Sequence, residues 1–205
     1  MTGSHGEADL DRRLADAIER LGNGLRSLSQ RSARGHGLSP LQQQAVLALS
    51  RQPEARREVN ALAAEFDVTT PTMSDAVGAL ERKELLTRSP IPDGRRRRLI
   101  LTERGEAVAR ELAAWDEQVV TSLGKLPTSD RATTLHTLLQ VIADLQRQGV
   151  VSVARMCTTC RFFSPDKHAD PKHADPSAPH HCELLRTPLP LTDLRTDCPE
   201  HQPAA

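Results

Sequence analysis

Four cysteines are the residues of this chain best suited to chemistry, and all of them lie after residue 156. Two residues separate Cys157 from Cys160, Cys182 follows after 21 more residues, and Cys198 after another 15. Four thiolates satisfy one tetrahedral zinc ion, or the four irons of one cubane iron–sulfur cluster. The spacing therefore predicts a metal site on all four, with reversible disulfide formation as the competing interpretation.

The identity of the metal is the harder question. Zinc sites with four cysteines usually use two close pairs, whereas this chain has one pair and two isolated cysteines. The string Cys157–Phe163, followed by Cys182-x-Leu184, Pro188 and Cys198, is similar to the small high-potential iron–sulfur proteins. That resemblance covers residues 157–198 and implies a [4Fe-4S] cluster, which Phe162 and Phe163 would shield from water. An iron–sulfur cluster is favoured, one zinc ion stays open, and the two phenylalanines could equally be a miniature core.

Histidines are frequent in the same region. Five of them follow the first cysteine, namely His168, His173, His180, His181 and His201. His180 or His181, beside Cys182, could replace a cysteine ligand, but exposed loop positions are the favoured interpretation. A five-residue repeat, 167–171 and 172–176, looks like a loop insertion.

A second group of chemically suited residues is basic. The formal net charge is zero, yet seven basic residues lie between positions 82 and 98: Arg82, Lys83, Arg88, Arg95, Arg96, Arg97 and Arg98. Asp93-Gly94 is a hairpin turn signal, so four of these arginines fall at or just after a hairpin tip. A basic hairpin neutralises phosphates along a nucleic-acid backbone. Arg95 can instead pair with Asp93 and brace the hairpin, and a solvated loop is the other interpretation.

Helices must position both groups, since aromatic residues are only 2% of the chain and the core has to rest on Leu, Val, Ala and Ile. Apolar spacings of three and four predict helices over residues 9–34, 57–66, 70–86, 103–123 and 127–148. Another helix begins at Pro40 behind a Ser39 cap and closes before Pro53, and Thr70 and Thr102 are further expected caps. Short strands flank Asp93-Gly94, the second over 97–102.

Two helices joined by a short turn, then a hairpin, then more helix, predict a winged helix-turn-helix. The fold class is mainly α with a small β-hairpin wing. The recognition helix would present its first residues to base edges and phosphates, and the wing would contact the backbone. The expected DNA-binding residues are Thr70, Thr72, Ser74, Asp75, Arg82, Arg95, Arg96, Arg97 and Arg98.

At this point the chain resembles the MarR-type winged-helix regulators over residues 9–150. The resemblance rests on Asp93-Gly94-Arg95, on Leu101-Thr102-Glu103-Arg104-Gly105, and on the segment 62–86, with Glu84 where glycine is common. It implies a homodimer through the first, fifth and sixth helices and a palindromic site in double-stranded DNA. The apolar stripes on those helices agree with an interface, although ordinary core packing would give the same stripes.

Several classes of protein are disfavoured. No run of about 18 apolar residues could span a membrane, and residues 1–9 lack the apolar core of a signal peptide, so we expect a cytoplasmic protein. No nucleotide-binding glycine motif and no nucleophile–base string is present, so an enzyme is not expected.

The domains we expect are a winged-helix DNA-binding and dimerisation domain over 9–150 and a cysteine-rich metal module over 155–205. The function we expect is a dimeric repressor whose DNA binding responds to a redox or metal signal at the four cysteines. The alternative is a regulator responsive to a small-molecule effector, in which zinc is purely structural.

Overall fold

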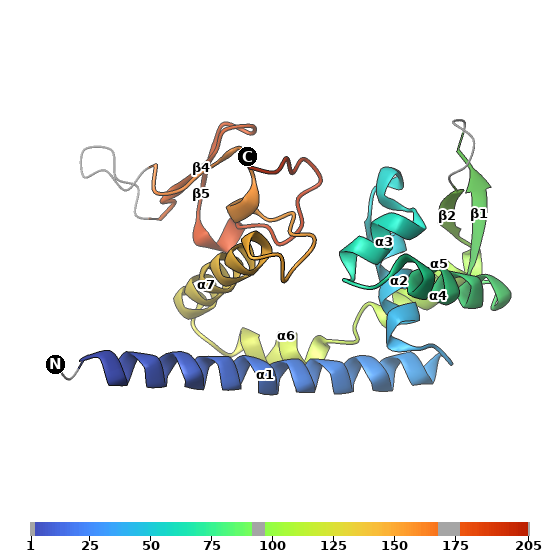
Figure 1. Cartoon of the computed structure of the whole chain (residues 1–205), viewed down its shortest axis with the longest axis horizontal. Coiled ribbons are helices and arrows are strands. Elements are labelled where there is room, and N and C mark those ends of the chain that lie inside the picture. Colours follow the sequence, from blue (N-terminus) through green and yellow to red (C-terminus); the bar gives the residue numbers. More distant parts are fainter. Residues whose placement is uncertain (1–2, 92–96, 168–176, 205) are drawn as a thin grey trace. The chain divides into compact units, whose positions relative to one another are not determined.

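The computed structural model describes residues 3–91, 97–167 and 177–204 (Figure 1). The elements fall into two compact units. The first unit holds residues 1–62 and 71–121, and the second holds 63–70 and 122–205.

The first unit begins with a long helix. The helix α1 (Gly3–Gly35) is followed by α2 (Pro40–Arg51) and a single 3-10 turn, η1 (Glu54–Arg56). Ser39 caps α2 as expected: its hydroxyl accepts from the Gln42 N–H at 3.2 Å, and the Gln42 side chain accepts from the Ser39 N–H at 3.2 Å. This reciprocal capping satisfies two donors that a helix start leaves open.

The elements that the sequence predicts to contact DNA follow in the expected order. They are α3 (Val59–Glu65), α4 (Thr70–Arg82), β1 (Leu86–Pro90) and β2 (Arg97–Leu101). The two strands pair antiparallel, with Leu86 opposite Leu101 and Pro90 opposite Arg97 (Figure 1). The Leu99 N–H also donates to the carbonyl of Arg57 at 2.7 Å, which ties β2 to the segment before α3. The predicted hairpin wing is therefore confirmed, while its tip, 92–96, lies outside the described residues.

Two boundaries differ from the sequence-based expectation at α4. The helix already includes Thr70, which was the predicted cap, and it ends at Arg82 rather than near Leu86. The early end has a local cause. Glu84 adopts a left-handed φ of 59°, the Leu85 N–H donates to Leu80 O, and the Glu84 N–H donates to Glu81 O. This double pattern is a Schellman closure, which stops a helix and turns the chain.

The next predicted helix, 103–123, is divided into two. The structure has α5 (Glu103–Leu112) and α6 (Glu117–Gly124), joined by a tight turn. In that turn the N–H groups of Ala113, Trp115 and Glu117 each donate to the carbonyl three residues earlier. Such bonds tighten the chain into a 3-10 geometry and interrupt the α-helical ladder. The continuous helix was a wrong prediction.

The core of the first unit is aliphatic. Its largest fully buried side chains are Leu49, Leu62, Met73, Leu80, Leu86, Leu99 and Leu112. They come from α2, α3, α4, the two strands and α5, and α2 packs against both α5 and β2. The core thus holds the base of α4 and the two strands of the wing in place.

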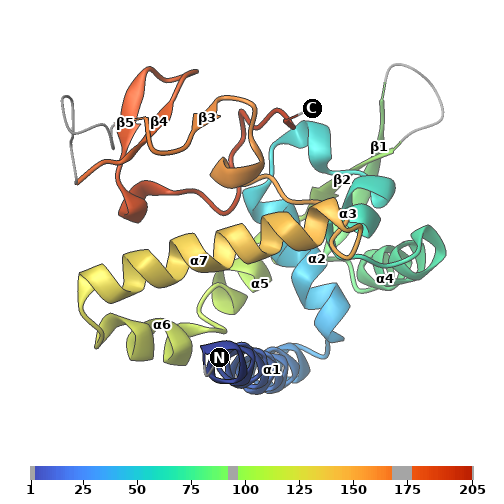
Figure 2. The same cartoon turned by 60° about the vertical axis from the view of Figure 1, so that its left-hand side comes forward.

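The second unit is built on α7 (Thr128–Arg147). After it come η2 (Cys157–Thr159), β3 (Phe163–Ser164), β4 (His180–Cys182), β5 (Thr187–Leu189) and η3 (Leu191–Asp193). The strands form an antiparallel sheet in the order β3-β4-β5 (Figure 2). The sequence predicted a cysteine-rich module here without naming its strands, and the chain forms this small sheet with β4 ending at Cys182.

A cysteine-rich segment of this size needs help to bury a core, and α7 supplies it. The buried cluster of the second unit contains Leu139, Ala143, Ala154, Met156 and Leu194. Two of these residues lie on α7, and the others lie on the segment that follows it. The sequence placed the last long helix with the DNA-binding domain, 9–150; this predicted boundary differs from the division into compact units.

The described fold is mainly helical with a small antiparallel wing, as the sequence predicted. Among the described residues, no helix is long and apolar enough to cross a lipid bilayer.

Candidate nucleic-acid interface and candidate metal centre

The helix α4, which the sequence predicts to be the recognition helix, has one buried and one exposed face. Met73, Ala76, Val77 and Leu80 are buried. The predicted contact residues Thr70, Thr72 and Asp75 are exposed, Ser74 is half-buried, and Arg82 is exposed at the far end of the helix. The helical period therefore separates the polar residues of the first turns from the core face.

The wing places its arginines in different roles. Arg97 is exposed at the start of β2. Arg98 forms an ion pair with Glu54 of η1, with 2.6 Å between Nη1 and Oε2. Arg88 of β1 pairs with Glu81 of α4 at 3.1 Å. Arg98, predicted to contact DNA, is thus engaged within the chain, and Arg95 and Arg96 lie outside the described residues.

Neither acidic partner was predicted from the sequence. Glu54 lies 44 residues from Arg98, and Glu81 lies seven from Arg88. No local pattern links such pairs, so only the folded chain could reveal them.

The four cysteines lie on separate pieces of the second unit. Cys157 and Cys160 lie at the two ends of the turn η2, Cys182 ends β4, and Cys198 lies in the C-terminal segment. They are not joined in disulfides. Cys160, Cys182 and Cys198 line one pocket of about 270 Å³, counted with its space open to solvent, together with Phe162, Leu184, Leu185, Arg195 and Glu200.

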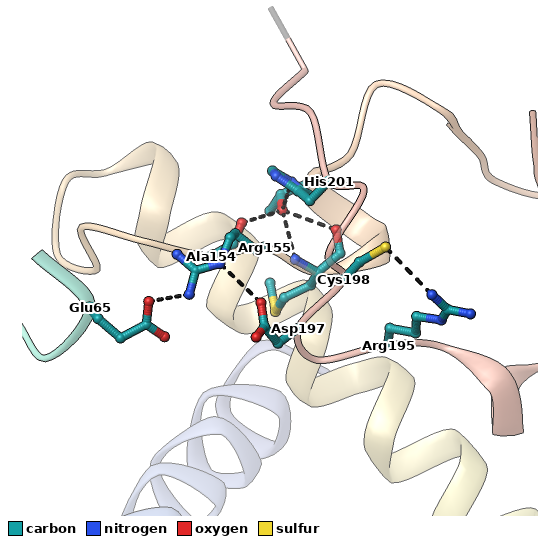
Figure 3. A network of polar contacts seen from close by, with 9 residues as sticks. Glu65, Ala154, Arg155, Arg195, Asp197, Cys198 and His201 are labelled. Atoms are coloured by element: carbon teal, nitrogen blue, oxygen red, sulfur yellow. Dashed lines mark hydrogen bonds and ion pairs between the residues drawn. The ribbon is translucent and has the colours of Figure 1, made fainter. Parts of the chain in front are cut away.

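Cys157 belongs to the same neighbourhood. Burial raises the pKa of the Cys157 thiol, the nearby Cys198 and Cys182 raise it further, and the backbone N–H of Arg195 lowers it. That N–H donates to the Cys157 sulfur at 3.2 Å. The Arg195 guanidinium donates to the Cys198 sulfur at 3.8 Å (Figure 3). One residue therefore offers hydrogen bonds to two of the four sulfur atoms.

A polar network surrounds the last cysteine (Figure 3). The Cys198 N–H donates to the carbonyl of Arg155 at 2.8 Å. The Arg155 guanidinium contacts Asp197 through Nε at 2.9 Å and Glu65 through Nη2. Roles for Arg155, Arg195 and Asp197 were not predicted from the sequence. Their positions one to three residues from a cysteine were the available signal, because residues beside metal ligands often orient them.

Thr159 holds the turn η2 from the inside. Its hydroxyl donates to the carbonyl of Ala154 at 2.6 Å and lies 3.0 Å from Nε2 of His201. It also accepts from the Met156 N–H at 3.3 Å. Thr159, between the paired cysteines, therefore links Ala154, before Cys157, to His201, after Cys198.

The candidate histidine ligands are placed differently from the cysteines. His180 is 2% exposed, and its ring packs against those of His136 and Phe163, with centroids 4.9 and 5.0 Å away. Burial lowers the pKa of His180, as does His136, while Asp166 raises it. His180 is a core residue of the unit in this arrangement. His181 lies 4.0 Å from Glu183, and His168 and His173 fall outside the described residues.

The sulfur arrangement allows a test of which metal group would fit. Among the described residues, no three His, Cys, Asp or Glu side chains converge closely enough to hold a single metal ion. A zinc ion needs sulfur atoms at about 2.3 Å from one centre. Cys160, Cys182 and Cys198 instead surround one open pocket, with Phe162 and two leucines in its wall. The donor set of four thiols is the one that a [4Fe-4S] cluster requires.

The comparison with known proteins concerns the first part of the chain. Residues 36–97 match a model of the MarR family. This segment includes α2, α3, α4 and the first strand of the wing. None of the curated proteins matches the chain.

Solved structures share the fold. A DNA complex of MepR from S. aureus has a TM-score of 0.58 at 19% identity, covering 63% of this chain and 94% of that one. The MarR family transcription regulator SP03579 gives a TM-score of 0.59 at 22% identity, covering 70% and 97%. A MarR family regulator from Rhodococcus sp. RHA1 gives 0.55 at 16%, covering 64% and 95%.

At these identities the likeness concerns the fold, and it extends over nearly the whole length of each solved chain. About a third of this chain has no counterpart in them. The segment from residue 36 to residue 97 thus matches the MarR family in sequence, and the fold around it is the winged helix of solved MarR-family regulators.

Proposed function

We propose that this chain is a MarR-type transcription regulator that binds double-stranded operator DNA as a homodimer and carries a metal site on its four cysteines. The observation that carries the proposal is the match of residues 36–97 to the MarR family together with the exposed polar start of α4. One solved relative in fold is named as a DNA complex. No enzymatic activity is part of the proposal.

DNA binding would use two elements. The first turns of α4 present the hydroxyls of Thr70, Thr72 and Ser74, which can donate to phosphates or base edges. Arg82 and the wing arginines would neutralise phosphates. Arg98 contributes differently, because its ion pair with Glu54 braces β2 against η1.

Dimerisation would use the exposed face of α1. Leu10, Leu14, Ile18 and Leu21 recur at helical spacing and each is about half exposed, between 49% and 53%. A contiguous apolar stripe of this kind normally marks an interaction surface. A second copy of the chain is the partner that the MarR resemblance implies, and it would double the number of reading helices on a palindromic site.

The cysteines would hold a [4Fe-4S] cluster through Cys157, Cys160, Cys182 and Cys198. When bound, such a cluster supplies a redox-active and oxygen-sensitive centre. The chain's own part is to hold the thiolates, with Arg195 donating to two of them. DNA binding would then respond to a redox or metal signal. The alternative is one structural zinc ion, with the signal coming from a small-molecule effector.

The DNA-binding proposal is tested on DNA selected by the full chain from a random double-stranded pool. We expect affinity to fall steeply between about 50 and 200 mM salt, and Arg97→Ala to reduce the slope of log affinity against log salt by about 0.9 for the lost phosphate contact. Arg13→Ala on α1, which removes a charge outside the reading elements, is the matched control. Failure to enrich any sequence, or equal effects of the two variants, would contradict the proposal.

The metal proposal is tested separately by anaerobic purification, an absorption spectrum, and analysis of iron, sulfide and zinc. Iron and sulfide with broad absorption near about 400 nm support the cluster. A colourless protein with one zinc per chain would make the site structural. The signal would then have to be sought among small molecules.

A further inference from the structure

The segment between α3 and α4 forms part of the second unit. Residues 63–70 are grouped with the cysteine-bearing unit rather than with the rest of the first unit. Two polar contacts join this segment to the stretch before Cys157. The Ser152 N–H donates to Oδ1 of Asp67 at 3.0 Å, and Arg155 forms an ion pair with Glu65.

Asp67 has an unusual backbone conformation in that segment. It has a left-handed φ of 50°, and the Val68 N–H donates to Ala63 O, which closes α3. The first residue of α4, Thr70, follows three positions later. A change in this turn therefore acts on the start of the recognition helix through the backbone itself.

Arg155 reaches toward the metal ligands at the same time. Its Nε contacts Oδ1 of Asp197 at 2.9 Å (Figure 3). Its carbonyl accepts the N–H of Cys198 at 2.8 Å. Its Nη2 contacts Glu65 (Figure 3). Arg155 thus joins the α3–α4 turn to Cys198 and its neighbour Asp197.

The environment of this arginine makes the link more than a surface ion pair. The side chains of Arg155 and Glu65 are only 17% and 25% exposed. Burial by itself lowers the pKa of Arg155, but the two carboxylates outweigh it and raise the pKa above its ordinary value. The guanidinium stays charged, so the link responds to geometry rather than to pH. Removing Arg155 takes an ion-pair partner from the partly buried carboxylate of Glu65, which is costly.

We propose that Arg155 couples the metal state of Cys198 to the α3–α4 turn through its paired contacts with Asp197 and Glu65. Ligation of Cys198 fixes the 197–198 segment and so holds Asp197 against Arg155. Loss of the metal releases that segment, weakens the contact with Glu65 and loosens residues 63–70. This inference rests on the proposed function of the cysteine site and assigns it a route to the recognition helix.

Hydrogen exchange of the backbone amides of residues 63–70 tests the coupling in the anaerobically purified full chain. We expect Cys198→Ser and Arg155→Ala each to speed this exchange about tenfold, the size of a typical coupling between sites. The double variant should be no faster than either single variant, because both changes break one link. Asp197→Asn keeps all four thiols and should give the same acceleration.

The matched control is Arg147→Ala, which removes an exposed arginine paired with Asp144 in the same unit and should leave the exchange of 63–70 unchanged. If Cys198→Ser and Asp197→Asn exchange at the wild-type rate, the coupling is wrong. It is also wrong if the accelerations of Cys198→Ser and Arg155→Ala multiply in the double variant. Metal content and binding to selected DNA are measured on the same wild-type sample. A metal-free wild-type chain overturns the proposed metal site and the coupling together, whereas a metal-loaded, DNA-binding chain with unchanged exchange overturns the coupling alone.

Discussion

Gly105 occupies a position that no other residue can fill without moving the backbone. A Cβ built on it would lie 1.9 Å from the carbonyl oxygen of Leu85. Around it, the Thr102 hydroxyl donates to Glu84 O at 2.7 Å and accepts from the Gly105 N–H at 3.0 Å. The Thr102 N–H donates to Leu85 O at 3.1 Å. The Leu-Thr-x-x-Gly string, Leu101–Gly105, therefore fixes the start of α5 against the residues that follow α4.

At the residue scale we expect Gly105→Ala to lower the free energy of unfolding of the first unit by about 2 kcal/mol or more, because the new methyl group collides with backbone. Trp115, the only tryptophan, lies in this unit and reports its denaturation by fluorescence. Gly24→Ala in α1 is the control. Nothing lies within 4 Å of its Cβ, so that variant should be neutral or stabilising. Equal destabilisation by both variants would contradict the close contact.

At the scale of the elements, four of the described helices end with the same hydrogen-bond pattern. α1, α3, α4 and α7 each close with a Schellman pair of hydrogen bonds around a left-handed residue. Gly37 and Gly149 serve this purpose in α1 and α7, whereas Asp67 and Glu84 serve it in α3 and α4. The two non-glycine residues, Asp67 and Glu84, lie on either side of α4. Glycine is common at the place of Glu84 in the MarR-type regulators that the chain resembles. The physical reason is that Glu84 has a φ of 59°, a left-handed conformation that glycine adopts without strain.

Glu84→Gly is expected to stabilise the first unit. A left-handed non-glycine residue costs about 1–2 kcal/mol, and the extra freedom of glycine in the unfolded chain costs about 0.5–1 kcal/mol, so the net gain should be roughly 0.5–1 kcal/mol. Glu84→Ala is the matched variant, since it removes the same carboxylate and its exposed pair with Arg104 but keeps the strain. Chemical denaturation followed by Trp115 fluorescence measures both, and a gain in the alanine variant equal to that in the glycine variant would contradict the explanation.

At the scale of the whole molecule, the apolar stripes of two long helices have different uses. On α7, Leu139 and Ala143 are buried, and Leu135 and Ile142 are partly buried, against the cysteine-rich segment. This part of the stripe is core packing. The stripe of α1 before Leu25 remains exposed in the single chain. The sequence alone presented both stripes as equally good candidates for core or interface.

The stripe on α1 predicts a specific assembly defect. Leu14→Glu combined with Ile18→Glu should convert a dimer into a monomer, because each buried side chain is worth on the order of 1 kcal/mol and the new charges would be buried in the interface. Light scattering gives the mass in solution, and Trp115 fluorescence checks that folding is retained. Arg12→Glu with Asn23→Glu places two acidic residues on the opposite face of α1 and should remain dimeric. A wild-type monomer, or a dimeric stripe variant, would refute this interface.

The sequence determined the parts of this protein that depend on local chemistry. Apolar periodicity predicted the helices, Ser39 and Thr102 were predicted as two caps, and Asp93-Gly94 predicted a hairpin whose strands are confirmed. The order of these elements was enough to predict a winged helix, because each rests on contacts within a few residues. The spacing of the cysteines named the candidate ligands but did not choose between metals.

Only the tertiary structure decided the features that join residues far apart. Arg98 pairs with Glu54 across 44 positions, and Arg155 contacts Glu65 across 90. The packing of α7 on the cysteine-rich segment and the pocket lined by Cys160, Cys182 and Cys198 are of the same kind. No periodic signal encodes such contacts, since they depend on how buried faces come together in three dimensions rather than on neighbours along the chain.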